Sequence, residues 1–395
     1  MMSEAPQDSA APLPAAGDAP QAEPEAAAVA PRRPIRVGWI AGKETFTRIG
    51  RILQPLTVGL MDELVGATVF LPERSDQHEL PNVPIGMISY SPLQWRVFRT
   101  KTVSLLAEEI QNAQLNLLHA LDSSAAALTR QLAEATHLPY VVSSYSLGDS
   151  RSLGTLDARC QAVLAASEPI QRELVGARAA APNKVLLVRP GVYQVNHATC
   201  YTDDKKSITI VAGGAMDDFD AYHALLRAFS DVRARNYDCV FFLIGNGKAE
   251  ARIRQSAKEM NLRSPLTFVD RQEASQLQGI LKSADIYISP RSTQQVDLVS
   301  LLAMAAGDPV LAAKSDVDDF FIDGKTALTF TVGNAAELTA KLVGILEDRQ
   351  AGTALADSAL QYLREHHSAA QMVSAVAGIY RCALEAPRPA LTATK

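Results

Sequence analysis

The chain has 395 residues, of which 47% are hydrophobic and 21% are charged. This size and composition are typical of a soluble globular protein with two ordinary domains, and no apolar run approaches the roughly 18 residues that cross a bilayer. The formal net charge is −5, and the first 31 residues contribute all of it with five acids and no base. The neutral remainder argues against nucleic acid as a main partner, because neutralisation of phosphates drives that binding.

Residues 1–33 form the first segment of the chain. The first 31 of them include 11 Ala and 6 Pro. Such a composition cannot bury enough apolar surface to offset the entropy of ordering, and it lacks the basic start and apolar core of a secretory signal. We expect a disordered tail, with a role in recruiting a partner as the alternative.

From Ile35 onward, short apolar runs alternate with helical patterns, which predicts a parallel sheet covered on both faces. We assign residues 34–195 to a first domain with strand candidates at 35–41, 67–71, 84–90, 115–121, 139–144, 161–167 and 184–188. The polar stretch 196–206 is expected to be a linker.

The same alternation continues after the linker. We assign residues 207–366 to a second domain with strand candidates at 207–213, 239–245, 266–269, 285–289, 309–313 and 327–331. An amphipathic helix is predicted at 369–385, inside a segment 367–386 that is followed by a short tail, 387–395. The fold class is therefore α/β, with two Rossmann-like doubly wound domains facing a central cleft, where ligands of open α/β sheets bind.

Cysteine and histidine usage gives no sign of a metal site. Cys160, Cys200, Cys239 and Cys382 lie far apart and form no CxxC or Cys/His cluster, and the histidines are scattered too. Free thiols fit a reducing cytoplasm. We therefore expect a cytoplasmic protein without a metal or other cofactor.

Residues 285–310 read DIYISPRSTQQVDLVSLLAMAAGDPV: a strand, a polar loop, a helix of small residues, Gly307 and a second strand. This segment resembles the donor-site motif of glycosyltransferase family 4. Further segments in family order are LLHALDSSAAALTRQLAEATHLPYVV, FFLIGNGKAEARIRQSAKEMNL and FIDGKTALTF. The resemblance spans about residues 35–385. It implies the GT-B fold, with the last helix crossing back to the first domain, and metal-independent, retaining transfer of a sugar from a nucleotide diphosphate donor.

The resemblance also shows where this chain departs from the family. Anchored on Leu225 and Leu226, the positions of the usual diphosphate-binding Arg and Lys hold Ala215 and Asp220, and the positions of the two motif glutamates hold Gln294 and Leu302. Two lost charge-assisted hydrogen bonds remove roughly 3–6 kcal/mol, or about 10²–10⁴-fold in affinity. Asp217, Asp218 and Asp220 add negative charge that repels a pyrophosphate, and Asp297 lies at the helix start where a phosphate would need the amides. The alternative is that these aspartates are helix caps and a solvated loop.

Other residues could restore the donor site. Arg271 and Arg291 are candidate phosphate clamps, with surface ion pairing as the alternative. In the first domain, Gly42, Lys43 and Arg48 follow the first strand, and Arg48 with Arg51 could equally form a solvated helix face. The remaining candidates for donor binding follow from the family pattern: His119, Tyr145, Gly214, Gly245, Gln294, Gln295 and Leu298. His119 could instead be a core residue.

Three functions remain open from the sequence. The first is a glycosyltransferase with an altered donor site, acting on a nucleotide-sugar and a glycan or lipid-linked acceptor in polysaccharide biosynthesis. The second is a catalytically inactive GT-B protein that serves as an interaction or regulatory subunit in glycan assembly. The third is a sugar-binding module without a nucleotide. Peripheral contact with the inner membrane is possible for such a protein, but no transmembrane segment is expected.

Overall fold

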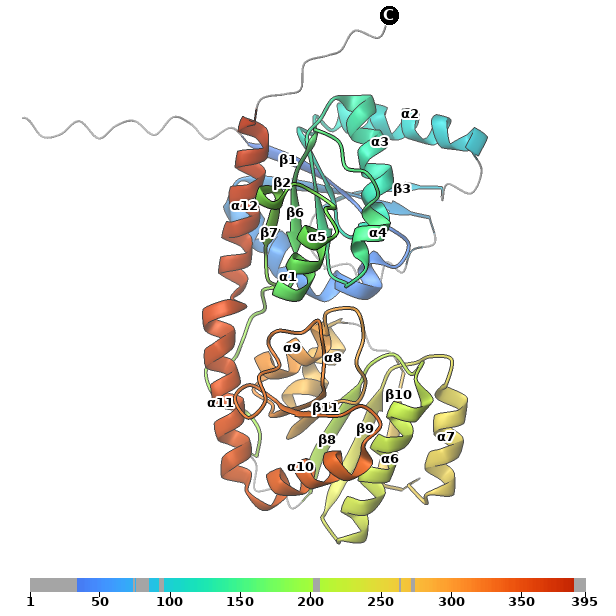
Figure 1. Cartoon of the computed structure of the whole chain (residues 1–395), viewed down its shortest axis with the longest axis vertical. Coiled ribbons are helices and arrows are strands. Elements are labelled where there is room, and N and C mark those ends of the chain that lie inside the picture. The colour runs from blue at the N-terminus through green and yellow to red at the C-terminus, as the bar shows by residue number, and fades with distance from the viewer. Residues whose placement is uncertain are drawn as a thin grey trace, which may run out of the picture. The chain divides into compact units, whose positions relative to one another are not determined.

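The computed structural model describes residues 34–73, 75, 85–91, 96–201, 207–262, 264–270 and 274–386. The two terminal tails, residues 202–206 of the expected linker, and Arg271 lie outside the described residues. Pro34–Lys395 forms one unit, within which two parallel sheets follow each other along the chain (Figure 1).

The first sheet has seven strands in the order β3-β2-β1-β4-β5-β6-β7, and every neighbouring pair is parallel. Its strands are β1 (Ile35–Ile40), β2 (Val65–Pro72), β3 (Gly86–Tyr90), β4 (Leu117–Ala120), β5 (Tyr140–Ser144), β6 (Cys160–Ala165) and β7 (Val185–Leu187). The helices between them are α1 (Thr45–Asp62), α2 (Arg96–Asn112), η2 (Ser123–Ala125), α3 (Ala126–Thr136), α4 (Asp149–Leu153), α5 (Glu168–Gly176) and η3 (Pro182–Lys184).

The second sheet has six parallel strands in the order β10-β9-β8-β11-β12-β13. Its strands are β8 (Ile208–Gly213), β9 (Cys239–Ile244), β10 (Leu266–Val269), β11 (Ile286–Ser289), β12 (Val310–Ala313) and β13 (Leu328–Phe330). The helices that follow its strands are α6 (Phe219–Ala234), α7 (Glu250–Glu259), α8 (Ala274–Lys282), α9 (Leu298–Ala306), α10 (Ala335–Glu347), α11 (Arg349–His366) and α12 (Ala369–Glu385).

Both sheets confirm the predicted α/β class. Central strands such as β4, β5, β11 and β12 are buried along their whole length, as expected for parallel strands covered by helices on both faces. Strand order reverses between β1 and β4 in the first sheet and between β8 and β11 in the second. Ligands of such sheets bind beyond the carboxyl ends of the strands at these points.

Helix α12, the last red helix in Figure 1, packs on the first sheet and on α1, although it follows the second sheet in sequence. The approach is close at Gly59 of α1, where a Cβ atom would lie 2.5 Å from a methyl carbon of Val373. Deeper in the same contact, the Trp39 indole N–H donates to the Tyr380 hydroxyl at 3.1 Å. Helix α12 therefore stabilises the first domain.

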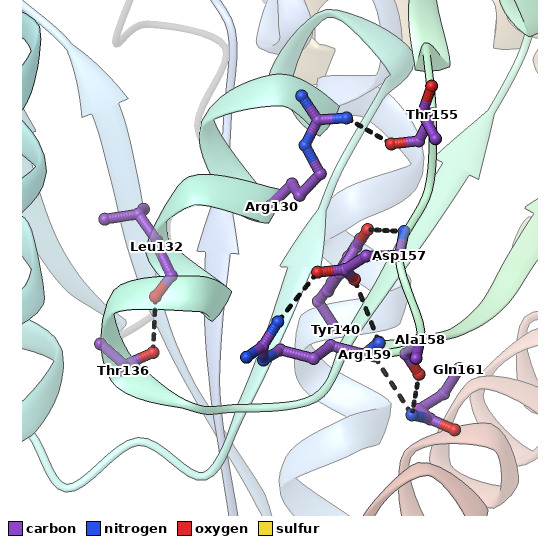
Figure 2. Close-up of polar contacts among 9 residues, drawn as sticks. All are labelled: Arg130, Leu132, Thr136, Tyr140, Thr155, Asp157, Ala158, Arg159 and Gln161. Carbon is purple, nitrogen blue, oxygen red and sulfur yellow. Dashed lines mark hydrogen bonds and ion pairs between the residues drawn. The ribbon is translucent and has the colours of Figure 1, made fainter. Parts of the chain in front are cut away.

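At the amino ends of β5 and β6, polar contacts fix the loop that leads into β6 (Figure 2). Arg130 of α3 donates to the Thr155 carbonyl, and Arg159 pairs with Asp157 at 3.1 Å. This edge is opposite the carboxyl ends of the strands, so the network belongs to the scaffold of the first domain. Among the residues that the structure describes, no helix is long and apolar enough to cross a membrane.

Candidate functional site

A cavity of about 500 Å³ lies at the carboxyl ends of strands β8, β9 and β11, and α1 of the first domain supplies another part of its wall. We call it the large cavity. Its lining consists of Glu44, Thr47, Arg48, Arg51, Gly213, Gly214, Ala215, Asp217, Ile244, Gly245, Asn246, Leu277, Tyr287, Arg291, Thr293, Gln295, Val296, Asp297, Leu298 and Val299. Its position is the one predicted for the ligand of a doubly wound sheet.

Two strand-end glycines form the floor of the large cavity. Gly214 follows β8 with φ +138° and Gly245 follows β9 with φ +136°, both in a region that favours glycine. A Cβ atom on Gly245 would lie 2.1 Å from the Gly214 carbonyl oxygen. Glycine is therefore required at Gly245, and it leaves open backbone beside the cavity.

Arg291 lies directly over this floor. Its Nε atom would be 3.0 Å from a Cβ atom placed on Gly214, and the Tyr222 hydroxyl would be 3.2 Å from the same point. Burial raises the pKa of Tyr222, and the positive charge of Arg291 acts in the opposite direction. No hydrogen bond or ion pair joins Arg291 to any other residue in the described parts of the chain. The guanidinium is thus available to a ligand.

Helix α1 contributes the other cations of the large cavity. Arg48 forms an ion pair with Glu44 at 3.1 Å, and the two side chains are 37% and 65% exposed. Such an exposed pair one helical turn apart contributes only about 0.3–0.5 kcal/mol, so a ligand can displace Glu44. Arg51 lines the large cavity and a smaller neighbouring one.

Asp297 is the N-cap of α9, as one of the two interpretations predicted. Its Oδ1 accepts from the amides of Val299 and Ser300 at 3.1 Å each, and its Oδ2 accepts from the hydroxyls of Ser289 at 2.6 Å and Ser300 at 2.7 Å. These amides are the ones a helix N-terminus would offer to a phosphate. In this chain a carboxylate already occupies them.

A second carboxylate lies behind the cap. The Asp297 amide donates to Asp318 Oδ1 at 2.8 Å, and the Ser315 hydroxyl donates to Asp318 Oδ2 at 2.7 Å. Burial, followed by the nearby charge of Asp297, raises the pKa of Asp318 to about 7. The start of α9 is therefore held by two acids, one of which takes up a proton near neutral pH.

Six of the donor-binding candidates from the sequence line the large cavity: Arg48, Gly214, Gly245, Arg291, Gln295 and Leu298. Five others do not: Gly42, Lys43, His119, Tyr145 and Gln294. Gly42 instead packs on Ser124, whose Oγ would be 2.1 Å from a Cβ atom on the glycine. Lys43 is exposed.

His119 is a core residue, which corrects its assignment to donor binding. It is 2% exposed, and its Nδ1 and Nε2 lie 2.6 Å from the Tyr380 hydroxyl and 2.8 Å from the Ser143 hydroxyl. Burial lowers the pKa of His119 to about 3. A neutral, fully bonded ring at this place holds α12 to the first sheet.

The loop that contains Tyr145 and the loop that contains Gln294 are joined by backbone hydrogen bonds at the rim of the large cavity. The Val296 amide donates to the Tyr145 carbonyl at 3.0 Å, and the Leu147 amide donates to the Gln294 carbonyl at 2.7 Å. Ser146 and Gln295 form an antiparallel bridge between these bonds. The two loops thus connect the first domain to the wall of the cavity.

Only some of the positions where the chain departs from the family pattern lie in the wall of the large cavity. Ala215 lines the large cavity, but Asp220 is exposed on the first turn of α6, outside the lining of either cavity. Asp217 lines the large cavity instead and accepts from the Lys248 amide at 3.0 Å. Of the two aspartates Asp217 and Asp220, Asp217 is therefore the one in the cavity wall, and its carboxylate already has a partner.

Leu302 lines the second, smaller cavity of about 230 Å³, which we call the small cavity. Its lining consists of Arg51, Gln54, Pro55, Val192, Tyr193, Gln194, Val195, Gln278, Leu281, Lys282, Leu302, Ala305 and Ala306. The sequence predicted one donor site and did not predict that Leu302 lines a second cavity.

Several lining residues of the large cavity were not predicted from the sequence. Asn246 follows a strand-end glycine, a place in the sequence that indicates a cavity residue, but no sequence feature marks Leu277, Tyr287 or Thr293 as lining residues.

Over the described parts of the chain, no group of three or more His, Cys, Asp or Glu residues could hold a metal ion. Cys160, Cys200 and Cys239 are buried free thiols, and Cys382 is an exposed one.

Comparisons with known proteins agree with this architecture. Residues 207–348 match the model of a family described as Glycosyl transferases group 1. The matched segment contains every strand of the second sheet and α6 to α10.

Two curated relatives are similar to parts of the chain. A phosphatidyl-myo-inositol mannosyltransferase of Mycolicibacterium smegmatis is 33% identical over 130 residues, which is 32% of each protein. The sulfoquinovosyl transferase SQD2 of Arabidopsis thaliana is 23% identical over 197 residues, 47% of this chain and 38% of that protein. The chain thus matches well under half the length of these relatives.

Solved structures resemble nearly the whole body of the protein. Anabaena HepE in complex with UDP superposes with a TM-score of 0.70 at 15% identity, over 88% of this chain and 100% of that one. Sucrose-phosphate synthase from Thermosynechococcus elongatus gives a TM-score of 0.70 at 17% identity, over 89% and 100%. These likenesses confirm the GT-B fold.

Proposed function

We propose that the protein is a glycosyltransferase of the family 4 type that binds a nucleotide-sugar in the large cavity. It would transfer the hexosyl group to a glycan or glycolipid acceptor with retention of configuration. The observation that carries the proposal is Arg291, whose guanidinium lies over the open backbone of Gly214 and has no hydrogen-bond or ion-pair partner among the residues that the structure describes. The match of residues 207–348 to the glycosyl transferases group 1 model, and structural neighbours that hold UDP or UDP-glucose, support this class of ligand.

The charges of the large cavity are consistent with a diphosphate. Its acids are Glu44, Asp217 and Asp297, and each already accepts a hydrogen bond from the protein. Arg291 can offer two parallel N–H groups to one phosphate, which is the geometry that guanidinium groups prefer. One such contact contributes about 1.5–3 kcal/mol, so Arg291 offsets roughly the loss of one family cation at Ala215.

The second candidate function is a catalytically inactive GT-B subunit. It is favoured by Asp297, which occupies the α9 amides that a phosphate would use, and by the apolar Leu302 at a position where the family motif has a glutamate. A donor in the large cavity would then rely on Arg291 and α1 alone. Binding measurements distinguish these two candidates.

Isothermal titration of the full chain with UDP-glucose, GDP-mannose and ADP-glucose tests the proposal. We expect saturable binding of at least one donor, and a loss of about 10–100-fold in affinity for Arg291→Ala, equivalent to one charge-assisted contact. Arg227→Ala is the matched control, because Arg227 is exposed on α6 and lines neither cavity. No binding of any donor at millimolar concentration would favour the inactive subunit.

A further inference from the structure

Tyr222 of α6 carries a buried hydroxyl that the fold does not use. The side chain is 0% exposed, and its hydroxyl oxygen has no hydrogen-bond partner among the residues that the structure describes. A phenylalanine would bury the same ring at this place on α6 without the polar atom. Because a buried hydroxyl without a partner destabilises a fold, the presence of a tyrosine here calls for a role other than packing.

The Tyr222 hydroxyl lies beside Arg291. A Cβ atom on Gly214 would be 3.0 Å from Arg291 Nε and 3.2 Å from the hydroxyl oxygen, so both polar atoms border the space that this glycine leaves empty. The two atoms are complementary, because an arginine Nε–H donates and a phenol oxygen accepts. Neither side chain has another hydrogen-bond partner in the described parts of the chain.

The acids around this pair are already engaged. Asp217, Asp218 and Asp297 lie close enough to act on the pKa of the Tyr222 hydroxyl. Each of them accepts from a backbone amide, at 3.0, 3.0 and 3.1 Å respectively. Arg291 is the cation that acts on the same hydroxyl, and it has no acid partner among the described residues. The Tyr222 oxygen is therefore left to the Arg291 guanidinium.

A guanidinium can contact a tyrosine and a phosphate at the same time. It carries five N–H groups in a planar fork. When the Nε–H points to a tyrosine oxygen, the end of the fork, formed by the two terminal nitrogens, remains free for two oxygens of one phosphate. Fixing the side chain in this way also reduces the rotamer entropy that is lost when a ligand binds. A neutral hydroxyl can thus raise the affinity of a single cation for a phosphate.

We propose that Tyr222 is a positioning residue for Arg291 in the large cavity. When a diphosphate binds, the Arg291 Nε–H donates to the Tyr222 hydroxyl, and the two terminal nitrogens hold the phosphate over Gly214. This inference rests on the proposed function, since it concerns the same donor site. It gives a role to a hydroxyl that has none in the core, and it compensates in part for the missing family cation at Asp220.

Titration calorimetry of the full chain with UDP and with inorganic pyrophosphate tests the coupling between the two residues. Tyr222→Phe should weaken the binding of both probes about fivefold, and Tyr222→Phe added to Arg291→Ala should cause no further loss. Unchanged affinity in Tyr222→Phe would overturn the inference. A full fivefold loss in the Arg291→Ala background would also overturn it, because Tyr222 would then act without Arg291.

Thermal unfolding separates a positioning role from a structural one. We expect the melting temperature of Tyr222→Phe to equal or exceed that of the wild type, because the variant loses a hydroxyl without a partner. A lower melting temperature together with weaker binding would assign the hydroxyl to the fold and overturn the inference.

Tyr201→Phe is the matched control for both measurements. It removes another buried hydroxyl without a hydrogen-bond partner in the described structure, at a residue that lines neither cavity. It should leave the affinity for both probes unchanged and should not lower the melting temperature.

The two probes distinguish failure of this inference from failure of the proposed function. If UDP binds through Arg291 and Tyr222→Phe binds it as the wild type does, the donor function stands and the inference fails. If UDP does not bind but pyrophosphate does, with the same dependence on both residues, the donor function fails and Tyr222 keeps its positioning role. Binding of neither probe to the wild type would overturn the inference.

Discussion

Single residues decide which charges of the large cavity face a ligand. Asp217 and Asp297 bond to backbone amides, Glu44 pairs with Arg48, and Arg291 pairs with nothing in the described structure. A cavity that is neutral by formal count therefore presents a cation to its contents. The proposed donor binding depends on this difference: the acids of the cavity already have partners within the protein, and Arg291 has none among the described residues.

The buried acid Asp318 gives a pH-dependent prediction for stability. Its pKa is raised from 3.8 to about 7, so between these values the unfolded chain releases a proton that the folded protein keeps. Stability should therefore fall as pH rises from about 4 to about 7, by at most about 1.4 kcal/mol per pH unit from this group, and should not change further above 7. Asp318→Asn should remove this decrease.

Urea unfolding of wild type and Asp318→Asn at pH 4.5, 6 and 8 measures the difference, because other groups contribute equally to both proteins. Asp316→Asn, at an exposed carboxylate two residues away, is the control and should retain the wild-type slope. Parallel pH profiles for wild type and Asp318→Asn would contradict the raised pKa.

Among single residues, the sequence predicts the role of those whose place in the backbone determines what they do. Asp297 precedes a helix and caps it, and Gly214 and Gly245 follow strands and face the ligand side. It could not predict the direction of a side chain. His119 lies at a strand end yet is buried in the core, and Asp220 occupies a cation position of the family but is exposed and does not line the cavity.

At the scale of elements, periodic hydrophobicity predicted the structure well. The helix expected at 369–385 has those bounds in α12, and the runs at 139–144 and 285–289 became β5 and β11. Both kinds of element bury apolar side chains at a fixed spacing, which a sequence displays directly. The rim contact between the loops at 145–147 and 294–296 has no such spacing, so the sequence did not reveal it.

The hydrogen bonds that hold α12 to the first sheet predict the cost of one substitution. Tyr380→Phe removes the hydroxyl that accepts from the Trp39 indole N–H and that also bonds to His119 Nδ1, all within the core. Because buried polar groups without partners cost about 1–3 kcal/mol each, we expect a loss of about 2–4 kcal/mol in the free energy of unfolding.

Chemical denaturation measures this loss. Tyr237→Phe is the matched control, since its hydroxyl bonds to Glu347 at the protein surface and its removal should cost under about 0.5 kcal/mol. Equal costs for the two variants would show that the α12 contact does not depend on the Tyr380 hydroxyl.

At the scale of the whole molecule, Asp319 joins the two domains. Its Oδ2 accepts from the Glu168 amide at 3.0 Å and from Arg189 at 2.9 Å, and both of these residues belong to the first domain. Asp319→Asn weakens a charge-assisted contact of about 1.5–3 kcal/mol. We expect the domains to separate more often, which exposes the Leu147 and Val296 amides of the rim bridge.

Hydrogen exchange followed by mass spectrometry tests this expectation. The rim segments 145–147 and 294–296 should exchange about tenfold faster in Asp319→Asn, while the core strand β5 keeps its rate. Asp316→Asn, which removes an exposed carboxylate nearby, should leave both rates unchanged. Uniformly faster exchange in β5 as well would indicate general destabilisation instead of domain separation.

A structure of the full chain in complex with UDP tests the proposed donor binding at Arg291. We expect the diphosphate to lie over Gly214, with phosphate oxygens about 2.7–2.9 Å from the Arg291 guanidinium, the spacing of a charge-assisted pair. Ordered UDP without any phosphate oxygen within hydrogen-bond distance of Arg291, or UDP bound outside the large cavity, would contradict it.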